Sequence, residues 1–452
     1  MLELSSSAIN FEPASAQSSL FYDDGNEKIV TVRGNGAMGV SCRGPGPREL
    51  VSFRLADGGP LAALKLSPGL QLAAFHRQLS PAAVHFVALR PGQEEELPEF
   101  AHPCRAKNAR LLGFQWTALN EILYITDKGI ELYQVLAEKR QLKHLRSHNI
   151  AINWFVYDSS TRVLLVSTGS AGTTLHPFLI RAGAFLRLGR LEVDLGQASA
   201  SPPRLALFDR DVSIATLYGR PSVLVLRHVP RDSAKVLVYQ LAKDASLEAG
   251  GRKCHELELG RSGKFALQVL DNLVLVHYQS AATTLLFDLA LGGLRASDAG
   301  GVEFQRHEPA LQLGIQVPAS VSRDPEASYD AQLQLYSENW VVLSPDLIVE
   351  PVEGHAWRLR IRLSQAVKAF ADPCSLCLFL LHRRGAKDLL LATLRELLAK
   401  GKLSLSNASA IFKWLNSAYL SAKTTKTQPS PSILILFNRL LGTEPQLLPH
   451  SN

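Results

Sequence analysis

From residue 20 to residue 363 the sequence consists of short apolar segments that come in pairs separated by turn residues. In one pair, segment 122–125 is followed by the turn Asp127-Lys128-Gly129 and by segment 130–135, in which apolar and polar residues alternate. Segments rich in β-branched and aromatic residues favour strands, and glycine adopts the positive φ that such a turn requires. The pattern predicts a β-hairpin, and similar pairs recur along this part of the chain.

The spacing of these hairpins indicates the architecture. First strands are predicted to begin near Leu20, Leu64, Leu112, Ile152, Val212, Phe265 and Leu333. Most intervals lie near the ~40–50 residues of a four-stranded propeller blade, and a blade buries both of its faces only when neighbouring blades close into a ring. We therefore predict a mainly β protein with a roughly seven-bladed, WD40-like β-propeller at residues 20–363. Two packed β-domains are the alternative, and the turn-rich inserts 196–203, 242–252 and 290–324 are expected to be loops at blade edges.

After residue 363 the apolar residues change to helical spacing. Asp372-Pro373 is typical of a helix start, and leucines 390, 394, 397 and 398 share one helix face, as do Ile411, Trp414, Leu415 and Ala418. We predict an N-terminal extension at 1–19, a short, truncated α-helical solenoid segment at 364–421, and a disordered tail at 422–452, which begins with a stretch rich in Lys, Thr, Ser and Pro.

Composition and charge limit the classes of function. No apolar run approaches the ~20 residues of a membrane-spanning helix, and the N-terminus lacks the features of a secretory signal. The five cysteines are scattered, which favours free thiols in a reducing compartment. The net charge of +7 permits association with acidic partners.

The motifs that suggest chemistry have simpler interpretations. Gly34, Gly36 and Gly39 form a G-x-G-x-x-G, but a strand and not a helix is expected after it, so a dinucleotide site is not predicted. Cys374 and Cys377 form a lone C-x-x-C on a predicted helix and are expected to be buried thiols. His144 and His148 lie four residues apart and are expected to be a solvated pair. We predict no catalytic residue, no metal site and no cofactor; a hydrolase that uses a propeller channel is the alternative.

His382-Arg383-Arg384-Gly385 is similar to the Phe/Leu-Arg-Arg-Gly motif of a phosphoinositide-binding propeller family. Here the motif falls beyond the last blade, between two predicted helices. We therefore expect a basic helix C-terminus that the helix dipole favours. A phosphoinositide-binding peripheral membrane propeller that acts independently remains the alternative function.

Several long segments resemble the regulator subunit of the MON–CCZ guanine-nucleotide exchange complex, the colon-cancer-associated Mic-like family. The resemblance is carried by 125–140 and by 145–149 with 153–154. Shorter matches are 107–109 with 112–114, 210–211 with 215–219, 260–267, 271–274, and 336–337 with Trp340. It extends from about Phe21 to about Tyr419. The helical region of the family normally continues well beyond the point where this chain ends.

The resemblance implies a propeller followed by a helical solenoid, without catalysis of its own. It implies an accessory scaffold subunit that binds the MON–CCZ heterodimer and, through it, supports activation of a late-endosomal Rab-seven-type GTPase in endosome maturation, autophagy and lysosomal trafficking. The expected location is the cytosol and the cytoplasmic face of late endosomes and lysosomes, with peripheral membrane association and no nucleic-acid partner.

One basic segment with interleaved leucines, residues 138–146, is the candidate contact surface for an acidic partner patch or for membrane headgroups. The candidate partner-binding residues are Lys139, Arg140, Lys143, Arg146 and His148. A solvated basic connection between blades is the other interpretation, and the sequence leaves both open.

Overall fold

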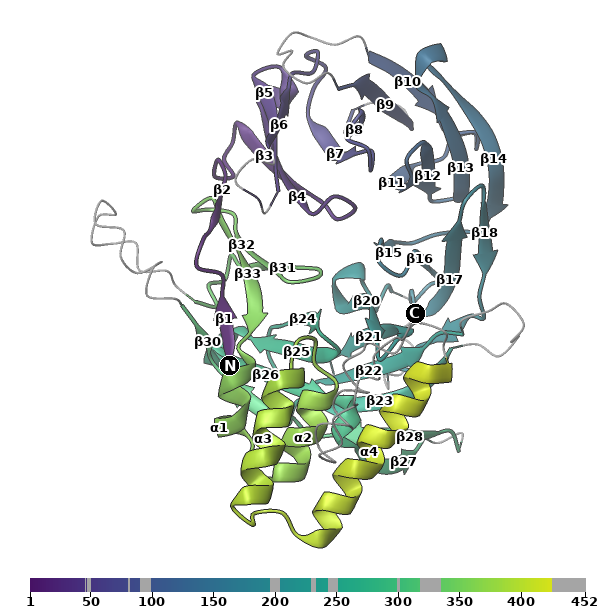
Figure 1. The fold of residues 1–452 in the computed structure, drawn as a ribbon. Helices are drawn as coiled ribbons and strands as arrows, with labels where there is room; N and C mark the ends of the chain where they lie inside the picture. The colour runs from purple at the N-terminus through teal and green to yellow at the C-terminus, as the bar shows by residue number, and fades with distance from the viewer. Residues whose placement is uncertain are drawn as a thin grey trace, which may run out of the picture.

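Seven β-sheets are arranged in a ring, and a group of helices lies at one end of it (Figure 1). The computed structural model describes residues 1–44, 46, 50–79, 82–89, 99–195, 204–228, 233–242, 251–298, 301–317 and 335–424. The prediction of a mainly β, seven-bladed propeller followed by a few helices is confirmed. Of the tail predicted to be disordered, residues 425–452 lie outside the described residues.

Each blade has four strands that pair in antiparallel fashion. In blades one to five these four strands follow one another along the chain from the centre of the ring outward, whereas β29 is the fourth strand of blade six and the N-terminal strand β1 is the fourth strand of blade seven. Blade one contains β3 (Ser18–Asp23), β4 (Lys28–Arg33), β5 (Gly39–Arg43) and β6 (Leu50–Phe53). Blade two contains β7 (Leu61–Leu66), β8 (Leu72–Arg77), β9 (Ala83–Ala88) and β10 (Glu99–Pro103). Blade three contains β11 (Leu111–Ala118), β12 (Glu121–Thr126), β13 (Gly129–Leu136) and β14 (Gln141–Asn149). Blade four contains β15 (Phe155–Asp158), β16 (Val163–Thr168), β17 (Thr174–Arg181) and β18 (Ala184–Arg187), and β19 (Leu191–Glu192) also pairs with β17. Blade five contains β20 (Val212–Leu217), β21 (Arg220–Arg227), β22 (Lys235–Gln240) and β23 (Arg252–Glu258). Blade six contains β24 (Phe265–Leu270), β25 (Leu273–Tyr278), β26 (Thr283–Asp288) and β29 (Leu311–Leu313). The seventh blade contains β31 (Val341–Leu343), β32 (Leu347–Glu350), β33 (His355–Ile361) and β1 (Leu2–Leu4), with β2 (Ile9–Asn10) and β30 (Ile315–Gln316) beside them.

The core lies between the blades. Each of seven clusters of buried apolar side chains combines residues from neighbouring blades, such as Val87 of blade two with Val30 of blade one, and Tyr124 of blade three with Phe86 of blade two. Central strands such as β16 are therefore buried on both faces and read as continuous apolar runs. This is why the pairs of apolar segments could be located from the sequence.

The N-terminus closes the ring. Strand β1 lies next to β33, with Leu2 opposite Ile361 and Leu4 opposite Leu359, and it provides the fourth strand of the seventh blade. Both leucines are almost completely buried. Residues 1–19 are predicted to be an extension that precedes the propeller, but in the structure their first strand belongs to it.

The described residues of the insert 290–324, which are 290–298 and 301–317, include strands, although loops were expected there. Strand β28 (Glu303–His307) pairs with the outer strand β23 of blade five in parallel, and β27 (Leu294–Ser297) pairs with β28. Strand β29 completes blade six, and β30 pairs in parallel with β1. Outer strands have unpaired N–H and C=O groups, and the insert satisfies these groups on blades five and seven. Residues 318–324 of the expected loop, like most of the other two inserts, lie outside the described residues.

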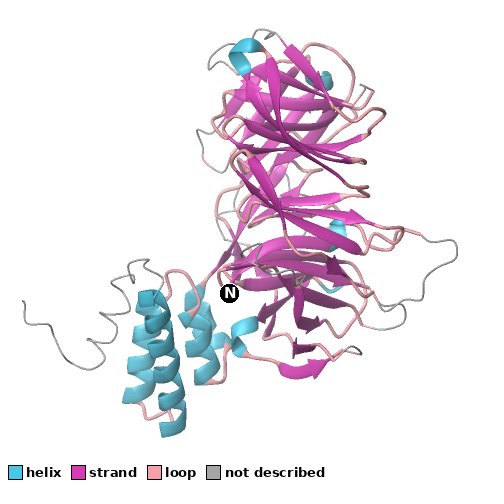
Figure 2. Ribbon diagram, turned by 90° about the vertical axis from the view of Figure 1, so that its right-hand side faces the viewer, coloured by secondary structure: helices cyan, strands magenta, loops and turns pink. Residues whose placement is uncertain are grey.

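In the described residues after the propeller, four helices lie beside one end of the ring (Figure 2). They are α1 (Ala366–Ala369), α2 (Pro373–Leu381), α3 (Lys387–Ala399) and α4 (Leu405–Thr424). Asp372 caps α2 by accepting a hydrogen bond from the Ser375 amide, as the Asp-Pro start predicts.

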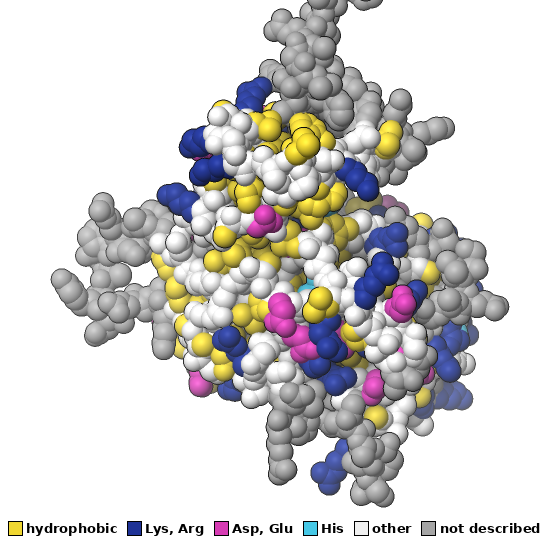
Figure 3. Space-filling view, turned by 90° about the horizontal axis from the view of Figure 1, so that it is seen from below, with side chains coloured by type: hydrophobic (Ala, Val, Ile, Leu, Met, Phe, Trp, Pro, Cys, Tyr) yellow, Lys and Arg dark blue, Asp and Glu magenta, His cyan; other side chains and the backbone are white. Residues whose placement is uncertain are grey.

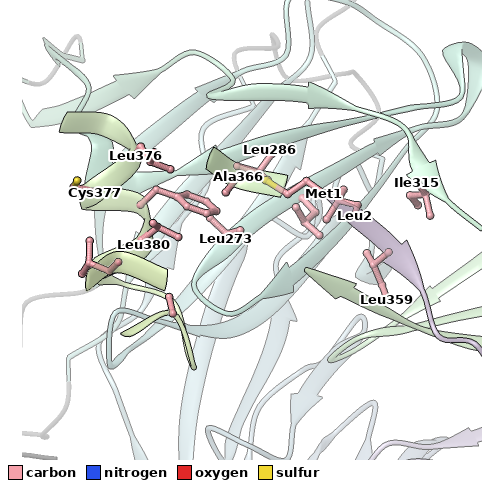
Figure 4. Close-up of a cluster of buried hydrophobic side chains, with 14 of the residues drawn as sticks. Met1, Leu2, Leu273, Leu286, Ile315, Leu359, Ala366, Leu376, Cys377 and Leu380 are labelled. Carbon is pink, nitrogen blue, oxygen red and sulfur yellow. The ribbon is translucent and has the colours of Figure 1, made fainter. Parts of the chain in front are cut away.

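The helices share one hydrophobic core with blades six and seven. Figure 4 shows Leu376 and Leu380 of α2 beside Leu273 of blade six, with Met1 and Leu2 nearby. Burial of this interface makes the helices and the closing blade one unit. Within the described part of the chain, no helix combines the length and the apolar character needed to cross a bilayer.

Candidate docking surface

The basic segment selected from the sequence forms the outer edge of the third blade. A 3-10 turn at Ala137–Lys139 is followed by Arg140 in the left-handed conformation, with φ of 49°. The chain then continues as β14, which pairs with β13 from Leu136 opposite Gln141 to Gly129 opposite Asn149. Most of the segment is therefore an edge strand. It is not the connection between blades that was one of the two interpretations.

The five candidate partner-binding residues lie along this edge. Lys139, Arg140, Lys143 and Arg146 are exposed, and the Arg146 guanidinium lies over the Phe185 ring of blade four, 5.3 Å from the ring centre. The fifth residue, His148, is half-buried, and its ring centre is 5.4 Å from that of Phe178.

The two histidines of the segment do not face one ion. A β-bulge between the Leu132 and Tyr133 pairings changes the register of β14, and His144 packs on Tyr133 while His148 packs on Phe178 of the next blade. Both rings are half-buried, so the expected solvated pair is wrong in this respect. Burial lowers the pKa of both histidines, which disfavours their charged forms. Among the described residues, no group of three metal-binding side chains is present.

Gly129 is required at the start of β13. Its φ is 155°, and a Cβ built there would lie 2.3 Å from the His148 carbonyl oxygen of β14. The positive φ predicted for this turn is confirmed, and the close approach of the two backbones gives a second reason for glycine. The position of β14 therefore depends on this residue.

The turn between β3 and β4 of blade one, residues 24–27, reaches across the centre of the ring and binds four other blades. The Asp24 carboxylate accepts hydrogen bonds from Lys65 of blade two and from Gln115 of blade three, whose Nε2 is 3.2 Å from Oδ1. The Asp24 carbonyl accepts a 3.4 Å hydrogen bond from the Ser159 hydroxyl of blade four. From blade seven, Arg358 pairs with Glu27 of the same turn.

The charged side chains of this turn are matched with opposite charges. Arg358 also pairs with Asp346, at 3.0 Å, and Lys65 pairs with Asp24. Burial raises the pKa of Asp23, whose carboxylate accepts a 2.8 Å hydrogen bond from the Leu66 amide. These contacts hold the blades together. No local sequence pattern predicts them, because the partners are far apart in the chain.

The His382-Arg383-Arg384-Gly385 motif joins the helices to the propeller. It lies between α2 and α3, as predicted, but Arg383 is buried and its Nη2 is 2.9 Å from the Asp288 carboxylate of blade six. The Arg383 Nε also donates to the Phe379 carbonyl at the end of α2, at 3.1 Å, as expected for a basic helix C-terminus. The side chain of Arg384 is 96% exposed. Only one arginine of the motif is therefore accessible to a ligand.

The remaining motifs have structural roles. Gly34 to Gly36 form a 3-10 turn between β4 and β5, and no helix opens there. Cys374 and Cys377 lie on α2, where Cys377 is buried in the core and Cys374 is half-buried. Burial raises the pKa of the Cys377 thiol to about 12, which keeps it protonated.

Comparison with known proteins identifies relatives of this chain. Residues 20–142 match the family model described as Regulator of MON1-CCZ1 complex, N-terminal. A mouse protein named Regulator of MON1-CCZ1 complex is 37% identical over 427 residues, and a human protein of the same name is 37% identical over 431 residues. Each alignment covers 92% of this chain and 63% of the relative. A Dictyostelium discoideum homologue is 22% identical over 60% of this chain and 25% of its own length. The chain thus spans less than two thirds of its mammalian relatives, and the resemblance proposed from the sequence is confirmed.

Proposed function

We propose that this chain is a non-catalytic scaffold subunit that binds the MON1–CCZ1 heterodimer, because residues 20–142 match the family model of the regulators of that complex and the human relative of that name is 37% identical. Through this contact it supports nucleotide exchange on a Rab-seven-type GTPase. The identity of 37% over 92% of the chain is the observation that carries the proposal.

The architecture agrees with a scaffold. A propeller is a rigid ring with many exposed loops and strand edges, which suits it to contacting more than one partner. The charges around the centre of the ring agree with a non-catalytic role, because Asp24 and Glu27 of the blade-one turn and Asp346 of blade seven are each paired with Lys65 or Arg358. In this proposal the heterodimer carries out the exchange chemistry.

Binding and exchange assays with purified components test the proposal. The full chain is mixed with the purified MON1–CCZ1 heterodimer and analysed by size-exclusion chromatography, and release of a fluorescent GDP analogue from the GTPase is measured with and without the chain. We expect a stable complex, faster exchange when heterodimer and chain are combined, and no exchange by the chain alone. Failure to form a complex would overturn the proposed role.

The full chain is needed in these assays. A fragment that starts at Phe21 lacks β1, so its seventh blade has lost its fourth strand. Loss of binding by such a fragment would report an open ring rather than a missing contact.

Location at late endosomes and lysosomes is part of the proposal. We expect the chain to reach these membranes through the heterodimer. Flotation with phosphoinositide-containing liposomes separates this from autonomous lipid binding: the chain floats only when the heterodimer is present. Flotation of the chain alone would support the independent lipid-binding propeller instead.

A further inference from the structure

The outer strand β14 differs from the other outer strands of the ring. It contains 9 residues, whereas β6, β10, β18 and β29 contain 3 to 5. Five of its residues are exposed (Gln141, Lys143, Arg146, Ser147 and Asn149). At a rise of roughly 3.3 Å per residue, the strand offers an edge of about 30 Å.

Two other outer strands of the same ring, β23 and β1, each have an additional strand on their outer edge. Strand β28 pairs in parallel with β23, from His255 opposite Gln305 to Leu257 opposite His307. Strand β30 pairs in parallel with β1 in the same way. In the described part of the chain no strand pairs with the outer edge of β14, which lies on the outside of the ring (Figure 1).

The charge of this edge selects the kind of strand that pairs with it. Lys139, Arg140, Lys143 and Arg146 are exposed along the turn and the strand, and the one acidic residue of segment 137–149 is Glu138. Lysine and arginine on a free edge oppose pairing with a second basic edge, because like charges then face each other. A second copy of β14 is therefore disfavoured, and an acidic strand is matched.

We propose that β14 binds an extended acidic segment of a partner protein as a fifth strand of the third blade. Backbone hydrogen bonds to the free edge supply the geometry, and the four basic side chains supply the charge preference. The inference goes beyond the proposed function, because it concerns any partner with such a segment and does not depend on the MON1–CCZ1 heterodimer.

Synthetic peptides test the two parts of the proposal separately. The probe is a fluorescent ten-residue peptide of alternating glutamate and valine, titrated with the full chain in a fluorescence anisotropy assay. One control peptide carries lysine in place of glutamate. The other keeps the glutamates but has N-methyl groups on alternate amides, which removes strand hydrogen bonds and keeps the charge. We expect saturable binding of the acidic peptide and at least tenfold weaker binding of both controls.

Charge reversal on the strand locates the site. The double variant Lys143→Glu/Arg146→Glu is expected to bind the acidic peptide at least tenfold more weakly. The matched control Arg181→Glu/Lys264→Glu reverses two exposed charges on other blades and is expected to stay within twofold of the unmodified chain. Thermal melting checks that both variants are folded. If the first variant is not folded, the single variant Lys143→Ala takes its place.

Three results would overturn the inference. Equal binding of the acidic peptide and its N-methylated form would mean attraction by charge without strand pairing. Unchanged binding by the Lys143→Glu/Arg146→Glu variant would place the peptide elsewhere. Absence of saturable binding to the unmodified chain at millimolar peptide would mean that β14 does not accept this class of ligand, whatever the result with the heterodimer.

Discussion

The Nη2 of Arg383 and the carboxylate of Asp288 lie 2.9 Å apart, and neither side chain has exposed surface. The Tyr218 hydroxyl donates to the same carboxylate, and the Arg383 Nη1 donates to the Asp271 carbonyl of blade six. The Arg383 Nη2 also donates to the Tyr218 hydroxyl of blade five, at 3.4 Å, so a single arginine beyond the last blade connects α2 to blades five and six. The position of the helices on the ring depends on this contact together with the shared hydrophobic core.

Replacement of Arg383 by alanine should strongly destabilise the protein. The change leaves the Asp288 carboxylate buried without its cation, and removal of one partner of a buried ion pair typically costs about 3–5 kcal/mol. Chemical denaturation of the variant should show a loss of unfolding free energy of this size.

The neighbouring arginine provides the control. The Arg384 side chain is 96% exposed, and its distance to Asp271 is 3.9 Å, so Arg384→Ala should change the unfolding free energy by less than about 0.5 kcal/mol. Equal effects of the two variants would contradict a specific role of the Arg383–Asp288 pair.

Closure of the ring by β1 leads to a second prediction. Leu4 is 1% exposed and lies in the core shared by blade seven and the helices, so Leu4→Ala should cost about 2–5 kcal/mol of unfolding free energy. The control is Leu79→Ala, because Leu79 is 84% exposed. Thermal or chemical denaturation compares the two, and a stability of Leu4→Ala equal to that of the control would mean that β1 does not stabilise the ring.

The sequence predicted those parts of the fold that are recorded in local periodicity. The first strands expected near Leu112, Val212 and Phe265 begin at Leu111, Val212 and Phe265 in the structure. Strands in the interior of a blade are buried on both faces, and a run of apolar residues records that burial directly.

Other parts of the fold depend on contacts between residues that are distant in the chain. Strand β1 has three residues and pairs with β33 more than 350 residues later, so no local pattern marks it as a strand. Strand β14 is largely polar because its edge is exposed, and for that reason it resembled a connection. Five candidate contact residues were located on one edge, but their role as binding residues stays a prediction.

The third prediction concerns Gly129, whose position holds β14 against β13. Gly129→Ala places a methyl group against the His148 carbonyl at a φ that is rare for residues other than glycine, and such backbone strain costs about 1–3 kcal/mol. We expect lower stability and faster hydrogen exchange in segment 137–149. Gly314→Ala is the control, since a Cβ at Gly314 meets no atom within 4 Å. Unchanged exchange in segment 137–149 would show that β14 tolerates the substitution.

The last prediction concerns pH and the buried His277 of blade six. Its Nδ1 is 2.9 Å from the Thr284 hydroxyl and its Nε2 is 3.1 Å from the Gln268 side-chain oxygen. Burial lowers the pKa of His277 to about 4, whereas the pKa of histidine in an unfolded chain is about 6.5.

The sign of the effect follows from proton binding. As the pH falls from about 6.5 to about 4, the unfolded chain takes up a proton that the folded chain excludes, so the folded state loses up to about 1.4 kcal/mol per pH unit from this group. His277→Gln removes the titrating group and keeps a side chain that forms hydrogen bonds. The loss of unfolding free energy between pH 7.5 and pH 5 should therefore be smaller in the variant than in the unmodified protein. Denaturation curves at both pH values give this difference, and equal losses in the two proteins would mean that His277 is not held neutral by the fold.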